Sequence, residues 1–422
     1  MPAPPTAFGF SDDPTRIRQA GREALSLALM DARNHTLHLA AQWDGAARGT
    51  GLQVPPGPGL VPPLWLLGHV GWFAEWWIAR NPQRHLGATC PPDGIRLASV
   101  LPLADSWWHA HFLGNPDHAE AIWQLDLPGL DSVKAYLLQT LETTLDLLEK
   151  APETDAGLYL FRLAVLHEDL QMQRLMAMAQ ILGIPLTVSE PLSRAARPPL
   201  WMPACQFALG GAATVPGFAI DNELPQHTIA VPAFEIDAQA LRWAQYVEFV
   251  DDAGYDRADL WHPQGWAWLQ AKAATEGRRG PRFVDQIGAA SGAVHQTRFG
   301  KSIRVSAAQA VMHVTWWEAD AWCRWAGRRL PSEVEWELAA SAGASRGLVW
   351  GDVWEWTGTT FAPYPGYVPG PWRVASQAAF GVCKVARGAA FLTPERLKSS
   401  KFRYFLDPGQ DEVFVGFRSC SL

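Results

Sequence analysis

The stretch AGLYLFRLAVLHEDLQMQRLMAMAQIL, residues 156–182, predicts one long helix near the middle of the chain. One stripe of side chains follows it at spacings of three or four residues: Leu163, Leu166, His167, Leu170, Gln171, Arg174 and Met178. Such a stripe faces a core, so the imidazole of His167 and the carboxamide of Gln171, one turn apart, need polar partners there. A metal ion between them satisfies that need, and so does a hydrogen-bonded pair of core side chains. The helix alone leaves both interpretations open.

Three earlier segments also have helical character. The first begins at Asp13-Pro14, where aspartate is a good cap and proline suits the first helical position. The second, about residues 64–79, is apolar on nearly all sides and is therefore expected to be buried, with His69 as its only basic residue. The third begins near Asp131. Together with residues 156–182 these segments predict a four-helix bundle, a fold that builds metal sites from inward side chains.

The bundle is expected over residues 1–190, and a different kind of sequence follows it. After a proline-rich connector, glycine, proline, tryptophan and short β-like runs such as residues 227–231 dominate. We therefore expect a mixed α+β domain over residues 200–422, so that the fold class is α followed by α+β. Because pockets favour domain interfaces, the active site is expected at the junction.

Composition narrows the class of protein. The 422 residues are 48% hydrophobic and 18% charged, which suits two globular domains. A formal charge of -7 gives no reason to expect nucleic acid or an anionic membrane as a partner. The five cysteines are scattered without metal-binding spacing, which is typical of reduced thiols in a cytoplasm. We also expect no signal peptide and no membrane-spanning segment.

Several phrases in the second half occur in one order: residues 314–321, 325–337, 353–357, 384–388 and 414–418. This set resembles the signature of the formylglycine-generating-enzyme (sulfatase-modifying factor) fold, across about the last two hundred residues. Pro331 and Ser332 also carry the signals of a helix start, with acidic residues in the first turn. The resemblance implies the fold of this second domain.

Formylglycine generation itself is not expected. The enzymes that perform it use a cysteine pair after the Arg-Gly phrase. From Arg387-Gly388 to Phe417 this chain has no cysteine, and Cys383 stands alone before that phrase.

A second resemblance depends on the fusion of that fold to a bundle of the DinB type. The order of parts is similar to that of the iron-dependent sulfoxide synthases of ergothioneine biosynthesis and of their relatives, the selenoneine synthases. Gly68-His69-Val70-Gly71-Trp72-Phe73-Ala74-Glu75 matches one histidine phrase of that family. His167-Glu168-Asp169-Leu170 matches the His-Glu-x-x-His phrase, with Gln171 in its last place. The resemblance implies Fe(II) bound by His69 and His167, O2 as oxidant, and hercynine, the betaine of histidine, as acceptor.

Gln171 is the first departure from the family pattern. A carboxamide is neutral like imidazole, but it is a harder and weaker donor for iron. Three interpretations compete: Gln171 is the third ligand, it holds a bound water, or the site binds iron poorly. We favour direct ligation.

The second departure concerns the family's catalytic tyrosine. At the matching phrase this chain reads Trp372-Arg373-Val374-Ala375. An indole can pass an electron but is a poor proton donor, so Trp372 and Tyr404, near the C-terminus, are the candidate catalytic residues. A packed aromatic is the alternative role for Tyr404.

The third departure lies where the family binds γ-glutamylcysteine. The matching segment, residues 403–411, keeps Arg403 but has Leu406 in place of an aspartate, and Gln410 or Asp411 in place of a base. An anionic dipeptide loses its charged clamp there. The candidate substrate-binding residues combine an aromatic wall for the trimethylammonium group with polar groups for a sugar: Trp72, Arg403, Phe405, Asp407, Gln410 and Asp411. Tyr404 belongs to the same wall.

These departures favour a selenosugar donor, and thus formation of a C–Se bond with hercynine. One alternative is an ergothioneine-type sulfoxide synthase that uses cysteine or γ-glutamylcysteine. An alternative of another class is a binding module that has lost its metal through Gln171.

Overall fold

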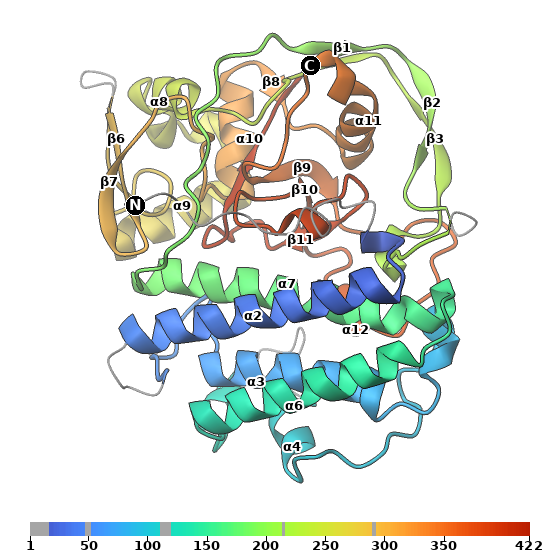
Figure 1. The fold of residues 1–422 in the computed structure, drawn as a ribbon. Coiled ribbons are helices and arrows are strands. Elements are labelled where there is room, and N and C mark those ends of the chain that lie inside the picture. The colour runs from blue at the N-terminus through green and yellow to red at the C-terminus, as the bar shows by residue number, and fades with distance from the viewer. Residues whose placement is uncertain (1–16, 47–51, 110–119, 213–215, 289–292) are drawn as a thin grey trace, which may run out of the picture.

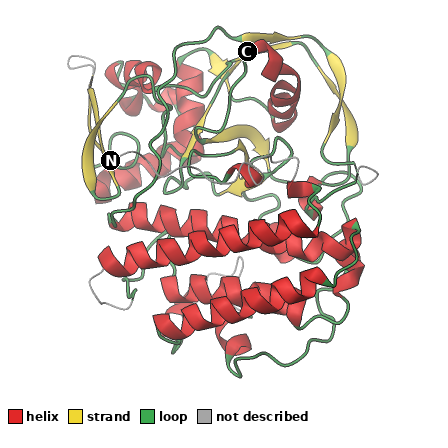
Figure 2. Cartoon of the chain, in the orientation of Figure 1, coloured by secondary structure: helices red, strands yellow, loops and turns green. Residues whose placement is uncertain are grey.

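The computed structural model describes residues 17–46, 52–109, 120–212, 216–288 and 293–422. A layer of helices lies on one side of the molecule and a mixed layer of strands and helices on the other (Figures 1 and 2). The predicted fold class, a helical bundle followed by an α+β domain, is confirmed. The predicted start of the first helix at Asp13-Pro14 lies outside the described residues.

Within the described residues four long helices form the bundle: α2 (Arg22–Ala46), α3 (Pro63–Ala74), α6 (Leu130–Glu149) and α7 (Asp155–Leu182). Each of α2 and α3 packs against both α6 and α7. A π-helical turn, η1 (Glu75–Ala79), continues α3, so the predicted helix over 64–79 has a wider last turn. Shorter helical segments connect these helices: η2 (Arg84–Thr89), α4 (Ala104–Trp108) and η3 (Ile122–Gln124).

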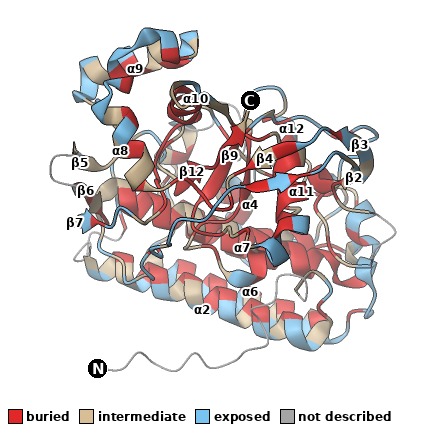
Figure 3. Cartoon of the chain, turned by 90° about the horizontal axis from the view of Figure 1, so that it is seen from above, coloured by how far each residue is buried: buried red, intermediate tan, exposed pale blue. Residues whose placement is uncertain are grey.

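Helix α7 has clear start and stop signals. The hydroxyl of Thr154 accepts a hydrogen bond from the backbone N–H of Gly157 at 3.1 Å, which caps the first turn. Gly183 ends the helix with a φ of 65°, a left-handed conformation that glycine adopts without steric cost. Nearly the whole helix is buried, because it lies between the rest of the bundle and the second domain (Figures 1 and 3).

The strands of the second domain that the structure describes form four sheets. Two have the orders β1-β4-β13-β8 and β11-β10-β9-β12, and the others are the hairpin β2-β3 and the meander β5-β6-β7. The strands are β1 (Leu200–Met202), β2 (Cys205–Leu209), β3 (His227–Val231), β4 (Phe234–Ile236), β5 (Val284–Gly288), β6 (Ala293–Arg298), β7 (Lys301–Val305), β8 (Arg328–Arg329), β9 (Trp354–Thr360), β10 (Lys384–Gly388), β11 (Tyr404–Leu406), β12 (Val415–Phe417) and β13 (Cys420–Ser421). The strand predicted at residues 227–231 is therefore confirmed as β3.

Helices flank these sheets: α8 (Trp243–Asp251), α9 (Pro263–Glu276), α10 (Trp316–Trp325), α11 (Glu333–Gly343) and α12 (Val374–Gln377). Short turns complete the domain: η4 (Asp221–Glu223), η5 (Gly254–Asp256), η6 (Ala258–Leu260), η8 (Ala344–Arg346) and η9 (Glu395–Leu397). The predicted helix start at Pro331-Ser332 is confirmed, since Ser332 caps α11 and shares a capping box with Glu335.

Polar contacts join α7 to the second domain. Arg396 of η9 binds the carboxylate of Asp169 with distances of 2.7 and 2.8 Å. Gln180 donates to the carbonyl of Thr297 and accepts from the N–H of Phe299, each at 2.8 Å. Because these groups are buried or nearly so, the contacts fix α7 against the second domain. Among the described residues, no helix combines the length and apolarity needed to cross a membrane.

Candidate functional site

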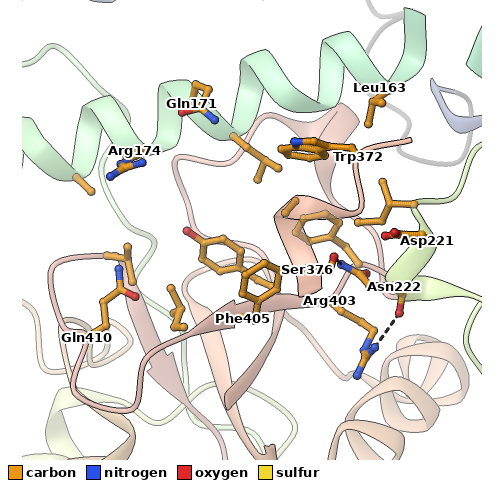
Figure 4. Close-up of a pocket in the computed structure, with 18 of the residues that line it drawn as sticks. Leu163, Gln171, Arg174, Asp221, Asn222, Trp372, Ser376, Arg403, Phe405 and Gln410 are labelled. Carbon is orange, nitrogen blue, oxygen red and sulfur yellow. Dashed lines mark hydrogen bonds between the residues drawn. The ribbon is translucent and has the colours of Figure 1, made fainter. Parts of the chain in front are cut away.

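A cavity of about 340 Å³ lies between α7 and the second domain (Figure 4). Its wall on the α7 side has the side chains of Leu163, Leu170, Gln171, Arg174 and Ala177. The predicted stripe of the helix therefore faces this cavity over part of its length. The second domain contributes Asp221, Asn222, Trp372, Ala375, Ser376, Phe402, Arg403, Tyr404, Phe405, Leu406, Gln410, Glu412 and Val413.

Two buried histidines meet next to this cavity. His69 of α3 and His167 of α7 have ring centroids 5.1 Å apart, in an edge-on arrangement. His167 stacks on Phe73 at 3.7 Å, and His69 stacks between Trp65 and Trp72. Burial lowers the pKa of His69 to about 3 and that of His167 well below its ordinary value. Both rings are therefore neutral at physiological pH, the form in which imidazole binds metal ions.

Gln171 connects this pair to the cavity. Its amide nitrogen lies 3.2 Å from Nε2 of His167, and its side chain lines the cavity. Among the described residues, Oε1 of Gln171 and Nδ1 of His167 are buried without a hydrogen-bond partner.

These residues fit a divalent metal ion. Two neutral imidazoles and one amide oxygen are all lone-pair donors, and a buried unpartnered oxygen beside them lacks the ligand it needs. In the part of the chain that the structure describes, no three His, Cys, Asp or Glu side chains gather as a metal site. Among the described side chains, Gln171 is the polar group that contacts His167, so it is the candidate third donor.

Trp372 stands next to the histidines on the cavity side. Its indole lies 5.4 Å from the ring of His167 and 5.4 Å from that of Phe73, and it also lines the cavity. The two imidazoles themselves are absent from the cavity wall. Gln171 and Trp372 are thus the predicted site residues that contact His167 and face the cavity as well (Figure 4).

The structure places Tyr404 and Phe405, which belong to β11, in the same cavity. The ring of Tyr404 lies 4.7 Å from that of Trp354, and burial raises the pKa of its phenol to about 12. A phenol with this pKa keeps its proton at neutral pH. Gln410 also lines the cavity, with its amide nitrogen 2.9 Å from a carboxylate oxygen of Glu412.

Three predicted substrate-binding residues lie outside the cavity wall. The indole N–H of Trp72 donates to Asp105 at 2.8 Å, and its ring packs on the far side of His69. Asp407 accepts from the N–H of Gly409 at 2.8 Å, which closes a local turn. Asp411 pairs with Arg278 and Arg282 at 2.6 and 3.0 Å. Trp72, Asp407 and Asp411 therefore do not line this cavity, and substrate binding by them stays a prediction.

Arg403 lines the cavity, but its guanidinium is bound to other groups of the protein. Its guanidinium binds Glu333 with distances of 2.9 and 3.1 Å, and it donates to the carbonyls of Asn222 and Ala362. It also lies 4.0 Å above the ring of Tyr364. These contacts direct Arg403 to protein groups and brace the wall, and binding of a ligand by Arg403 stays a prediction.

Sequence reasoning did not assign several polar residues that the fold brings to the cavity. Asp221 and Asn222 belong to η4, which no motif marked. Asn222 donates to Ser376 at 2.9 Å, while its Oδ1 is buried without a partner among the described residues. One oxygen of Asp221 accepts from Tyr367 and from the N–H of Gly370. Arg174 could have been assigned to the cavity from the sequence, because it lies on the same helical stripe as His167.

Comparisons with known proteins bear on this arrangement. Residues 189–351 match the family described as sulfatase-modifying factor enzyme 1-like domain. A "Hercynine oxygenase" of Mycolicibacterium smegmatis is 30% identical, over 94% of this chain and 98% of that protein. One of Mycolicibacterium thermoresistibile is 29% identical over 96% of each chain. A "Formylglycine-generating enzyme" of Streptomyces coelicolor is 33% identical, over 38% of this chain and 52% of its own length.

Proposed function

From the premise that the chain belongs to the hercynine oxygenase family, we propose that it is an O2-dependent, non-heme Fe(II) enzyme that joins selenium from a selenosugar to the imidazole ring of hercynine. The observation that carries the proposal is the buried pair His69 and His167 with Gln171 beside the cavity. Conversion of the resulting selenoxide to selenoneine then requires removal of the sugar and a two-electron reduction of the selenium by a separate reductant.

The proposed iron ligands are His69, His167 and Gln171. When bound, iron supplies positions at which O2 and the chalcogen donor react, as in other three-ligand sites. The protein's part is to keep both imidazoles neutral and to exclude water from them with Phe73 and Trp372. The unpartnered amide oxygen is available to a metal ion or to a bound water, and we propose that it binds the metal directly.

The net reaction balances without a further reductant. An imidazole C–H and a selenol Se–H each lose hydrogen as the C–Se bond forms, and selenium gains one oxygen atom. The second oxygen atom of O2 leaves as water with both hydrogens. Because the phenol of Tyr404 lines the cavity, we assign proton delivery to this hydroxyl, and Trp372 to electron transfer or shielding.

The aromatic side of the cavity supports hercynine as acceptor. A trimethylammonium group cannot donate hydrogen bonds and is attracted by the faces of aromatic rings. Tyr404 and Phe405 supply such faces in the described cavity. Trp72, the third candidate for this wall, does not line it.

The opposite side supports a sugar donor. Sugar hydroxyls need acceptors, and Asp221 together with the unpartnered Oδ1 of Asn222 supplies them. Ser376 adds a hydroxyl, and Arg403 is already bound to Glu333. These residues replace Asp407 and Asp411 in the argument for a neutral donor. A carboxylate near Asp221 meets repulsion instead of a clamp.

Arg174 favours a second candidate, an ergothioneine-type sulfoxide synthase with a cysteine or γ-glutamylcysteine donor. Its guanidinium lines the cavity and can pair with a donor carboxylate. The two carboxylates of γ-glutamylcysteine exceed what this one cation neutralises, since Glu412 lies close by.

The test measures hercynine-dependent O2 uptake by the iron-loaded protein, with one chalcogen donor at a time. We expect uptake with a 1-seleno-sugar and slower uptake with the matched 1-thio-sugar, whose recognition is the same. His69→Ala is the control that should abolish uptake. Fast uptake with γ-glutamylcysteine alone moves the assignment to a sulfoxide synthase, and no uptake with any donor favours a metal-free binding module.

A further inference from the structure

Arg174 and Gln171 lie one turn apart on α7, and both line the cavity (Figure 4). Residues three apart on a helix have Cβ atoms about 5–6 Å from each other. In hercynine two carbon atoms separate the imidazole ring from the carboxylate, a distance of about 4–5 Å at standard bond lengths. A hercynine ring placed near Gln171 therefore has its carboxylate within reach of Arg174.

We infer that Arg174 binds the carboxylate of the betaine acceptor and so determines how its imidazole is oriented, an inference that rests on the proposed function. A guanidinium offers two parallel N–H donors to a carboxylate. This residue holds the acceptor, while Asp221 and Asn222 hold the donor.

The surroundings of Arg174 suit a betaine. Burial lowers the pKa of its guanidinium, and nearby Tyr404 and Glu412 partly offset that effect. Glu412 also accepts hydrogen bonds from Gln410 and from the N–H of Asp411, at 2.9 and 3.2 Å. The positive and negative groups of a betaine are one carbon apart, and Arg174 and Glu412 present the opposite charges in the same part of the cavity.

The two ends of the cavity also differ in charge. Arg174 and Gln410 lie on one side in Figure 4, and Asp221 and Asn222 lie on the other. The carboxylate of Asp221 repels a second carboxylate, whereas Arg174 attracts it. The acceptor's carboxylate is therefore bound favourably at the Arg174 end of the cavity, and the donor's hydroxyls are bound favourably at the Asp221 end.

The experiment compares the binding of two ligands by two proteins, in the manner of a double-mutant cycle. Calorimetry without O2 measures binding of hercynine and of its decarboxylated analogue, trimethylhistamine, to the iron-loaded protein and to Arg174→Gln. We expect the native protein to prefer hercynine by on the order of 10- to 100-fold, as a charge-assisted hydrogen bond predicts. Arg174→Gln should remove that preference, with binding of the analogue changed less than about threefold.

Arg174→Lys keeps the charge without the planar fork and should retain part of the preference, which carries the test if Arg174→Gln fails to fold. Arg304→Gln, a change at an exposed arginine of β7, is the matched control and should leave both affinities unchanged. Equal weakening of both ligands, a preference that survives Arg174→Gln, or an effect confined to the donor's KM overturns the inference while hercynine turnover stands. Failure of the native protein to bind hercynine overturns the proposed function as well.

Discussion

Gln171 is the proposed iron ligand at which this chain departs from the family pattern, and substitution of this residue tests the proposal. It occupies the turn after His167 where the resembling family has a histidine, and its amide oxygen is buried without a partner among the described residues. An amide keeps the site's charge the same as imidazole does, but it binds iron more weakly. If Gln171 is the third ligand, as proposed, the iron has a weaker donor there than an imidazole would supply.

The first prediction concerns bound iron. His69→Ala and His167→Ala should each abolish it, because each removes one imidazole of the buried pair that lies next to the cavity on Gln171's side. Gln171→His should keep or raise iron content, since it introduces the stronger ligand. Metal analysis of purified variants, with a thermal melt of each to confirm folding, makes the measurement. Unchanged iron occupancy in Gln171→Ala would show that Gln171 is not a ligand.

At the scale of elements, α7 was the part of the fold that sequence predicted best. Its apolar spacing predicts a helix over residues 156–182, and the structure has this helix at Asp155–Leu182. The π-helical turn η1 was not predicted, because a widened turn depends on packing and not on a sequence period. The polar side of the cavity was also missed, since η4 and α12 come together with α7 only in the folded chain.

The second prediction concerns the contact that fixes α7 to η9. Arg396 binds Asp169 at 2.7 Å and also binds Asp31, and only 7% of Arg396 and 1% of Asp169 are exposed. Arg396→Met leaves a buried carboxylate without its cation and should lower the free energy of unfolding by about 3–5 kcal/mol. Urea titration measures the change. The double variant Arg396→Met/Asp169→Leu should recover part of the loss, and a double variant as unstable as the sum of both single ones would contradict this explanation.

At the scale of the whole molecule, motifs identified the family and the histidines, while the long-range fold decided which residues reach the cavity. Trp72 was expected there as part of an aromatic wall for the trimethylammonium group, but its indole N–H donates to Asp105 and it does not line the cavity. Asp407 and Asp411 were expected from their place in the C-terminal segment, yet local turns and arginines bind them. Asp105 and Arg278 lie far in sequence from Trp72 and Asp411, so no motif shows these two contacts.

The third prediction separates this chain from the formylglycine-generating relatives. Burial raises the pKa of Cys383 to about 11, and it also raises the pKa of Cys420. A raised pKa means that little thiolate is present at neutral pH, so neither thiol is an activated nucleophile. Replacing both residues with alanine should leave hercynine-dependent turnover intact, and alkylation of Cys383 should accelerate as pH rises towards 11. Lost turnover in a variant with a native thermal melt would count against the account.

The donor is the central claim, and one competition tests it most directly. Iron-loaded native protein receives hercynine, O2 and equal concentrations of a 1-seleno-sugar and γ-glutamylcysteine in one vessel. Mass spectrometry then measures the selenium-coupled and sulfur-coupled products at low conversion, whose ratio gives the ratio of kcat/KM values. The account predicts at least roughly tenfold more selenium product, which corresponds to about 1.4 kcal/mol of transition-state discrimination. An equal or larger amount of sulfur product would contradict the selenosugar assignment and identify an ergothioneine-type sulfoxide synthase.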